Sequence, residues 1–262
     1  MQYTIYQVDA FADSVFSGNP AAVIPLEKWL PDEVMQKIAM ENNLSETAFF
    51  VPTQNGYHIR WFTPLTEVNL CGHATLASAH VLFNHLGFNK KEIKFESKTG
   101  ELTVKKESQF IVLNFPVSEL KEIEPPQNIK QAFGNRPVKC FKGREDLLFE
   151  FNNEADIKNL QPDFQFMKTL DTRGIIATAA TTSEKYDFVS RFFAPIEGID
   201  EDPVTGSAHT VLIPYWAKKL GKNELLAKQI STRGGVLHCK LLGERVEIGG
   251  QAVTYLQGEI FV

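Results

Sequence analysis

The sequence predicts an α+β protein with two pseudo-symmetric lobes, each a barrel-like mixed β-sheet wrapped around a central helix. Two observations lead to this prediction: an internal repeat, and one strongly apolar helix among strands in each copy. Short stretches match at an offset of 131 residues, which becomes 134 after a three-residue insertion in the second copy. The matched stretches are Thr47-Ala48 with Thr178-Ala179, Arg60-Trp61-Phe62-Thr63-Pro64 with Arg191-Phe192-Phe193-Ala194-Pro195, Gly72-His73-Ala74 with Gly206-Ser207-Ala208, and Leu86-Gly87 with Leu220-Gly221. A duplicated chain folds into two similar units, and the cleft between such units is a common place for a small-molecule site.

The first quarter of the chain has two strand patterns and one helix pattern. Residues 3–10 alternate apolar and polar side chains, which is typical of a half-buried strand. A turn at 17–20 precedes an apolar strand at 21–24. A helix is expected from Pro31 to about residue 42, because proline suits the first helical position and acidic residues follow it.

The remainder of the first copy surrounds one apolar helix with strands. Residues 47–51 are β-branched and aromatic, so we expect a strand there, and Glu46 lies where the chain enters it. Residues 73–86 are apolar on nearly all sides of a helix, which predicts a buried helix closed by Gly87 as a left-handed cap. Further strands are expected at 57–62, 92–96, 101–105 and 110–115.

The second half repeats this pattern after a proline-rich stretch at about 117–128, which we expect to cross between the lobes. Pro214 lies inside the second candidate helix and predicts a kink or a different start for that helix. Strands are expected at 140–151, 174–178 and 187–193, with a hairpin at 235–248.

These elements place the N-terminal lobe at residues 1–117 and the C-terminal lobe at residues 128–251. The last strand, at about 252–262, is a candidate to return to the N-terminal lobe.

The composition excludes several classes of function. The net charge is −5, and the sequence has no basic run that could follow a phosphate backbone, so nucleic acid is not an expected partner. No stretch approaches the about 18 apolar residues of a membrane-spanning helix, and the N-terminus lacks a signal-peptide pattern, so we expect no membrane partner and a cytoplasmic protein. The three cysteines, Cys71, Cys140 and Cys239, have no CxxC spacing, so reduced thiols are expected.

The two apolar helices begin at glycines, Gly72 and Gly206. A helix N-terminus offers backbone N–H groups without intrahelical partners, and glycine lets a ligand approach the backbone closely. Two such ends that face one cleft could bind a carboxylate. The plainer interpretation is that both are turn glycines, with Thr205 or Ser207 as ordinary N-caps.

Two carboxylates break the symmetry of the repeat. Glu46 matches Ala177, and Asp202 lies in the stretch that only the second copy lengthens. Either carboxylate could take part in general acid–base chemistry, and His73 could hydrogen-bond a substrate or carry a proton. The alternatives are a solvated or capping Glu46, a solvated acidic loop around Asp202, and a local hydrogen bond for His73.

Neither a metal nor a cofactor is expected. The histidines form no HExxH motif, Cys71 with His73 supplies only two ligands, and no glycine-rich phosphate loop is present. A hydrolytic role for Cys71 would need a base from elsewhere in the chain.

Five motifs in order along the chain resemble the phenazine-biosynthesis PhzF-like family. They are Val8-Asp9-Ala10-Phe11, Gly18-Asn19-Pro20-Ala21-Ala22-Val23, Ser45-Glu46-Thr47-Ala48-Phe49, Cys71-Gly72-His73-Ala74-Thr75, and the run from Asp200 to His209. The resemblance implies the diaminopimelate-epimerase-like fold, with the active site between two related lobes and commonly a homodimer.

The same resemblance implies roles for single residues. Glu46 occupies the position of the acid/base glutamate in a cofactor-free isomerisation of a dihydro-hydroxyanthranilate. His73, Asp202 and Ser207 match the supporting residues of the family, and the amides of Gly72 and Gly206 would hold the substrate carboxylate. Ser45, in the motif of Glu46, is counted with the substrate-binding residues.

The sequence therefore predicts a cytoplasmic, cofactor-independent isomerase that moves a proton on a small carboxylate-bearing substrate. One alternative is an amino-acid racemase or epimerase that uses Cys71 with a carboxylate, although residues 204–208 hold no second cysteine. The other alternative is a non-catalytic protein that binds a small molecule or a partner.

Overall fold

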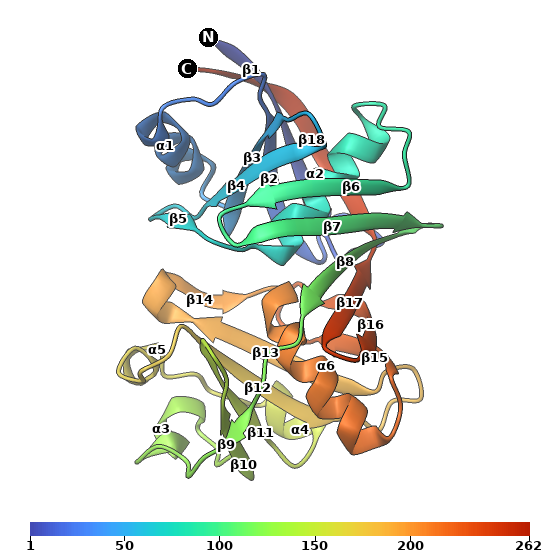
Figure 1. The fold of residues 1–262 in the computed structure, drawn as a ribbon. Coiled ribbons are helices and arrows are strands. Elements are labelled where there is room, and N and C mark those ends of the chain that lie inside the picture. The colour runs from blue at the N-terminus through green and yellow to red at the C-terminus, as the bar shows by residue number, and fades with distance from the viewer. The chain divides into compact units, whose positions relative to one another are not determined.

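The computed structural model describes all residues from Met1 to Val262, and the chain forms two compact units. Unit 1 consists of Met1–Phe115 together with Glu247–Val262, and unit 2 consists of Pro116–Val246. Both units are mixed α/β and are built mostly of strands (Figure 1). No helix of the chain is both long enough and apolar enough to span a membrane.

Unit 1 is a mixed sheet with two parallel steps. Its strands pair in the order β18-β1-β2-β3-β4-β6-β7, where β2–β3 and β4–β6 are parallel and the other pairs are antiparallel. The short β5 also pairs with β4, and β8 with β7. The elements are β1 (Gln2–Ala10), β2 (Asn19–Pro25), α1 (Asp32–Asn42), β3 (Glu46–Pro52), β4 (Tyr57–Phe62), β5 (Glu67–Val68), α2 (Gly72–Asn84), β6 (Glu92–Ser97), β7 (Gly100–Glu107), β8 (Phe110–Pro116) and β18 (Ala252–Phe261).

The C-terminal strand returns to unit 1 along its whole length. The backbones of β1 and β18 pair from Gln2 with Phe261 to Ala10 with Ala252, and the two chain ends lie side by side (Figure 1). The amino group of Met1 donates to the carbonyl oxygen of Val262.

Helices cover both faces of the sheet of unit 1. The outer helix α1 packs Met35 and Ile38 against Phe49 and other apolar side chains of the sheet. The inner helix α2 packs on β1, β2 and β3 and is buried from Gly72 to Ala79. Because β3 has a helix on each face, its residues 47–51 are all buried, as the continuous apolar run in the sequence predicts.

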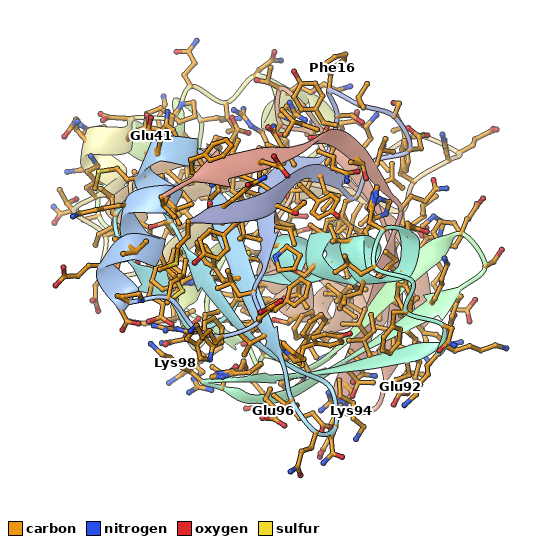
Figure 2. The ribbon with its side chains drawn as sticks, turned by 90° about the horizontal axis from the view of Figure 1, so that it is seen from above. Phe16, Glu41, Glu92, Lys94, Glu96 and Lys98 are labelled. Atoms are coloured by element: carbon orange, nitrogen blue, oxygen red, sulfur yellow. The ribbon has the colours of Figure 1, made fainter.

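The strand β6 has one buried and one exposed face. Ile93 is buried there, while Glu92, Lys94 and Glu96 are exposed. Figure 2 shows these three charged side chains at the outer surface of the unit. The strand thus has the period-two alternation that its sequence predicts.

Unit 2 repeats the strand pairing of unit 1. In unit 2, β11–β12 and β13–β15 are parallel, and β12–β13, β13–β14 and β15–β16 are antiparallel, in the same sequence of steps as β2 to β7. The elements are β9 (Lys121–Glu122), α3 (Ile129–Phe133), β10 (Lys139–Lys142), β11 (Asp146–Glu150), α4 (Glu154–Lys158), α5 (Phe164–Met167), β12 (Gly174–Ala180), β13 (Phe188–Ala194), η1 (Pro195–Glu197), β14 (Ile199–Asp202), α6 (Gly206–Leu220), β15 (Glu224–Gln229) and β16 (Gly235–Leu242). The strand β17 (Arg245–Gly250) begins in unit 2 and continues into unit 1 from Glu247.

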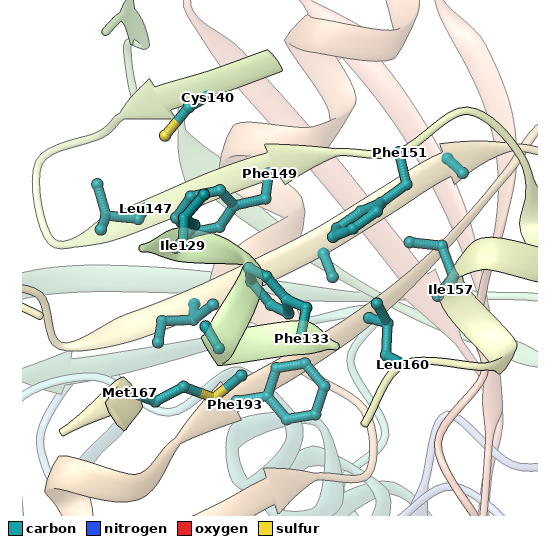
Figure 3. Close-up of a cluster of buried hydrophobic side chains, with 14 of the residues drawn as sticks. Ile129, Phe133, Cys140, Leu147, Phe149, Phe151, Ile157, Leu160, Met167 and Phe193 are labelled. Carbon is teal, nitrogen blue, oxygen red and sulfur yellow. The ribbon is translucent and has the colours of Figure 1, made fainter. Parts of the chain in front are cut away.

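The outer core of unit 2 is aromatic. Figure 3 shows Phe133 of α3 packed with Phe149 and Phe151, and ring centroids in these two pairs are 5.1 and 5.3 Å apart. The inner helix α6 lies on the other face of β12, where the indole Nε1 of Trp216 donates to Thr178 Oγ1 at 3.0 Å. The sheet of unit 2 therefore also lies between outer helices and one inner helix.

The inner helix α6 differs from the expectation for Pro214. The helix starts at Gly206, the residue matched to Gly72, so the prediction of a different start is wrong. It continues through Pro214 to Leu220. Proline has no N–H for the carbonyl oxygen of Thr210 four residues earlier. The backbone N–H of Ser118 donates to that oxygen instead, at 3.2 Å, so the helix keeps this carbonyl satisfied.

Candidate functional site

Glu46 and His73 are brought together in unit 1. Glu46 is the first residue of β3, and His73 lies in the first turn of α2. His73 Nε2 is 3.1 Å from Glu46 Oε2, and the side chains are only 4% and 12% exposed. Two of the predicted site residues thus form one buried pair.

Asn19 contacts the other side of the His73 ring. It is the first residue of β2, it is fully buried, and its Nδ2 is 3.1 Å from His73 Nδ1. When the ring is neutral, the amide N–H donates to Nδ1, which leaves the ring proton on Nε2. The parallel pairing of β2 with β3, with Ala21 opposite Glu46, brings Asn19 and Glu46 to the same end of the two strands.

The electrostatics of this pair keep a proton on Nε2. Burial lowers the pKa of His73, but the neighbouring Cys71 and Glu46 raise it well above its usual value. Nε2 carries a proton both in the neutral tautomer described above and in the imidazolium. A proton on Nε2 therefore faces Glu46 Oε2 in either state, with the two atoms at ion-pair distance.

Cys71 is the N-cap residue of α2, and its thiol is buried. Its Sγ lies 3.5 Å from His73 Nδ1. Burial, together with the charge of Glu46, raises the pKa of the Cys71 thiol to about 11. At neutral pH the thiol is thus protonated and is a weak nucleophile and a weak base.

Glu46, Cys71 and His73 also hold three candidate ligand atoms for a metal ion within 4.8 Å of one another. Cys71 and His73 are neighbours in the sequence, whereas Glu46 is distant from both, so only two ligands were expected. However, Cys71 contacts Nδ1 of the ring and Glu46 contacts Nε2. The ring of His73 thus lies between the thiol and the carboxylate, with one nitrogen toward each.

Asp202 belongs to a second cluster, in unit 2. It ends β14 and is 7% exposed. Thr205, the N-cap residue of α6, donates from Oγ1 to Asp202 Oδ2 at 2.5 Å. The amide of Gln229, at the end of β15, contacts both residues and is fully buried.

Ser207 has a cationic neighbour. Arg173 donates from Nη2 to Ser207 Oγ at 3.3 Å and to the carboxylate of Asp146 at 2.8 Å. Burial raises the pKa of Asp146, and the guanidinium of Arg173 opposes this effect. Gly174 makes room for the arrangement, since a Cβ there would lie 2.2 Å from the Phe192 ring and 2.7 Å from Asp146.

The two predicted carboxylate-binding glycines start the inner helices. Gly72 is the first residue of α2, Gly206 is the first residue of α6, and neither helix has a side-chain N-cap hydrogen bond. The backbone N–H groups of both first turns are therefore not satisfied by a capping side chain and suit an anion. Ser45 precedes β3 and is partly exposed.

Sequence reasoning missed three polar residues of these clusters. Asn19 stands in a motif that was noticed, yet the motif gave no reason to pair it with His73, 54 residues away. Gln229 and Arg173 had no sequence signal, because Gln229 reaches its partner from the end of β15 and Arg173 from the bend before β12.

Similarity to known proteins identifies the family of this chain. Residues 8–258 match the family described as "Phenazine biosynthesis-like protein". An uncharacterized isomerase of Pseudomonas aeruginosa is 50% identical to this chain over 260 residues. The alignment covers 99% of each of the two chains. The crystal structure of a PhzF-family phenazine biosynthesis protein from Enterococcus faecalis superposes with a TM-score of 0.96 at 48% identity, with both chains covered completely.

The fold extends to more distant proteins. A hydroxyproline epimerase from Agrobacterium vitis has a TM-score of 0.65 at 9% identity, with 99% of this chain and 92% of that chain covered, which shows a shared fold. The resemblance found in the motifs is confirmed, and the chain belongs to the phenazine biosynthesis-like (PhzF) family, as an isomerase of that family.

Proposed function

We propose that the protein is a cofactor-independent isomerase that moves a proton on a small carboxylate-bearing substrate, with Glu46 as the general acid/base. The observation that carries the proposal is the buried contact of Glu46 with His73, 3.1 Å from Oε2 to Nε2. Acid–base catalysis needs a carboxylate with a fixed orientation, and the ion-pair contact with the buried ring restricts the orientation of Glu46. Family membership supports the same role.

The reaction conserves all atoms. Glu46 takes a proton from one carbon of the substrate, the electrons of that C–H bond enter the conjugated system, and Glu46 returns the proton to a second carbon. An enol produced by this shift becomes a ketone when its hydroxyl proton moves to carbon. Because the proton resides on Glu46 between the two steps, it can exchange with solvent.

The remaining predicted residues bind and orient the substrate in this proposal. The N–H groups that follow Gly72 and Gly206 and the hydroxyl of Ser207 would hold the carboxylate, and Ser45 would support the same end of β3. Asp202 and His73 would position or polarise the reacting group. Thr205 supports Asp202 with its 2.5 Å hydrogen bond.

A cysteine-dependent racemase is the second candidate, since Cys71 Sγ lies 3.5 Å from His73 Nδ1. Two features weigh against it. The pKa of the thiol is raised to about 11. In addition, Thr205 occupies the position in the second copy that Cys71 has in the first, at the offset of 134. A two-thiol mechanism therefore has only one thiol available at these helix starts.

The test is deuterium incorporation, followed by NMR in D₂O. The protein is incubated with dihydro-hydroxyanthranilate and with a panel of small amino and enol acids, each beside Glu46→Gln. Glu46→Gln is expected to lower exchange by about 10²–10⁴-fold with folding intact. Full exchange in that variant would refute the role of Glu46, and binding without exchange for every compound would favour the non-catalytic alternative.

A further inference from the structure

The side-chain amide of Gln229 has an orientation that chemistry fixes. Its Oε1 is 2.9 Å from the backbone N of Thr205, which can only donate a hydrogen bond. Its Nε2 is 2.8 Å from the backbone oxygen of Asp202, which can only accept one. A flipped amide would lose both bonds, so Nε2 must be the group that faces Asp202 and Thr205.

This orientation determines the direction of the next hydrogen bond. The second proton of Nε2 points to Thr205 Oγ1, at 3.2 Å. Since the hydroxyl oxygen accepts from Gln229, the proton of the hydroxyl is directed to Asp202 Oδ2, at 2.5 Å. Gln229, Thr205 and Asp202 thus form a hydrogen-bonded relay with a single polarity, which ends on the carboxylate of Asp202.

The same strand end also holds the backbone next to Asp202. Ser231 Oγ donates to the carbonyl oxygen of Pro203 at 2.7 Å, and it accepts from the N–H of Gly234 at 3.0 Å. Residues 202–205 link β14 to α6. Within this link, the carbonyl of Asp202 and the N–H of Thr205 bond the side chain of Gln229, and the carbonyl of Pro203 bonds the side chain of Ser231.

The internal repeat shows that the fold does not require this relay. Strand β15 of unit 2 corresponds to β6 of unit 1, because Phe188 opposite Ala227 matches Tyr57 opposite Phe95. By this correspondence Ser97 stands where Gln229 stands. Ser97 Oγ donates to the carbonyl of Gly100 within its own hairpin, at 2.8 Å. Unit 1 therefore builds the same strand-to-helix link without a clamping amide.

We propose that Gln229 is a positioning residue, which fixes the carboxylate of Asp202 for the reaction through Thr205. This inference rests on the proposed function, in which Asp202 orients the substrate. It explains why a fully buried amide stands at this strand position only in the copy of the repeat that carries Asp202. The relay makes Oδ2 of Asp202 an acceptor with a fixed partner and thereby sets the plane of the carboxylate.

The first experiment compares Gln229→Ala and Gln229→Glu with the wild type in the deuterium-exchange assay with dihydro-hydroxyanthranilate. Gln229→Ala is expected to lower kcat by about 10²-fold, as misplacement of a catalytic group by about 1 Å does, with a smaller change in KM. Gln36→Glu is the matched control, because Gln36 Nε2 also donates to a backbone carbonyl, that of Thr63, at 2.9 Å. A kcat of Gln229→Ala equal to that of the wild type would overturn the proposal.

Gln229→Glu gives a readout that a merely structural role would not produce. A protonated glutamic acid keeps one donor and one acceptor, whereas the ionised form has only acceptors and faces the carbonyl of Asp202. The kcat of Gln229→Glu, divided by that of the wild type, should therefore be highest at acidic pH and fall as the introduced carboxyl ionises. Thr205→Ser, which keeps the hydroxyl, should retain the wild-type kcat, and Thr205→Val should lower kcat. The loss of kcat in the double variant Gln229→Ala/Thr205→Val should be smaller than the sum of the two single losses in free energy, because both residues act through one relay. A ratio that is constant with pH, or additive losses, would contradict the relay.

A second measurement separates this inference from the proposed function. Amide hydrogen exchange of residues 202–206, followed by mass spectrometry, needs no substrate. In Gln229→Ala, exchange should be faster in this segment and unchanged in unit 1, and unchanged exchange at Thr205 would overturn the positioning role. If no compound shows Glu46-dependent deuterium incorporation, the proposed function fails. The amide exchange then still decides whether Gln229 holds the segment.

Discussion

His73 Nε2 lies 3.1 Å from Glu46 Oε2, and the other nitrogen of the ring lies 3.1 Å from the amide of Asn19. These three buried side chains come from the starts of β2, β3 and α2. The arrangement resembles the general scheme in which a base is oriented by a second group, which is in turn oriented by a third. The carboxylate of Glu46 thus has a fixed neighbour in the ring of His73, whose other nitrogen contacts Asn19.

Replacement of His73 by phenylalanine should lower Glu46-dependent exchange by about 10- to 100-fold. The aromatic ring remains, but Glu46 loses the polar nitrogen at 3.1 Å, and a polar contact with a charged group contributes about 1.5–3 kcal/mol. The exchange rate and urea unfolding of His73→Phe should be measured together. His58→Phe is the control, since His58 packs edge-on against Trp29 in the same unit. Wild-type exchange in His73→Phe would show that His73 does not orient the base.

Replacement of Cys71 by serine should leave exchange within a few-fold of the wild type. The pKa of the Cys71 thiol is raised to about 11, so the thiol is not the base at neutral pH. Inactivity of a correctly folded Cys71→Ser would instead favour the racemase alternative.

The same raised pKa predicts how Cys71 changes stability with pH. Its folded pKa exceeds the unfolded value of 9.0, so the native state binds more protons between pH 9 and about 11. The stability due to the protonated thiol is then complete below pH 9 and is lost as the pH rises to about 11. Cys71→Ala should therefore lose less stability than the wild type over this interval in urea unfolding. Parallel curves for the two proteins would contradict the buried-thiol assignment.

The repeat allowed much of the fold to be predicted from the sequence. The match of Arg60 with Arg191 places corresponding strands, and their pairing follows the same parallel and antiparallel steps in both units. The buried inner helices follow from their apolar sequence, because a helix without a polar face must be covered on all sides. The partners of single polar side chains could not be predicted, since they depend on strand register.

The candidate site, too, could be predicted only in part from the sequence. Glu46 and His73 were predicted as site residues, and their contact follows once β3 and α2 are in place. Asn19 and Gln229 were not predicted, because the chain separates them from their partners by 54 and 27 residues. The substrate and the homodimer implied by the resemblance stay predictions, since neither follows from the packing of one chain.

Acid should destabilise the protein through His209. This residue is fully buried, its Nδ1 donates to the carbonyl of Thr205 at 2.8 Å, and burial lowers its pKa from 6.5 to about 4. The unfolded state therefore binds more protons between pH 6.5 and 4, and stability falls as the pH falls through this window, by on the order of 3 kcal/mol. His209→Gln cannot be protonated and should lack this part of the pH dependence in urea unfolding. An unchanged slope between pH 4 and 6.5 would show that His209 is not the group responsible.

Two matched ion pairs should contribute unequally to stability. Arg60 bonds Glu67 through Nε and Nη2 at 2.8 and 2.9 Å, and Arg191 bonds Glu201 through the same atoms at 2.7 and 2.8 Å. The four side chains are 13–19% exposed, so loss of one carboxylate leaves a largely buried guanidinium and should cost about 1–3 kcal/mol.

The difference between the pairs lies in what each arginine keeps. After Glu67→Gln, Arg60 still has the carboxylate of Asp32 at 2.8 Å. After Glu201→Gln, Arg191 keeps no carboxylate partner; it retains the carbonyl of Ile157 at 3.3 Å and the Phe193 ring. Glu201→Gln should therefore be the more destabilising change. Urea unfolding can follow it directly, because Trp216 is the only tryptophan of unit 2. Equal losses of unfolding free energy in the two variants would mean that the exposed Asp32 does not compensate Arg60 for the loss of Glu67. The contribution of each arginine to stability would then depend on Glu67 or Glu201 alone.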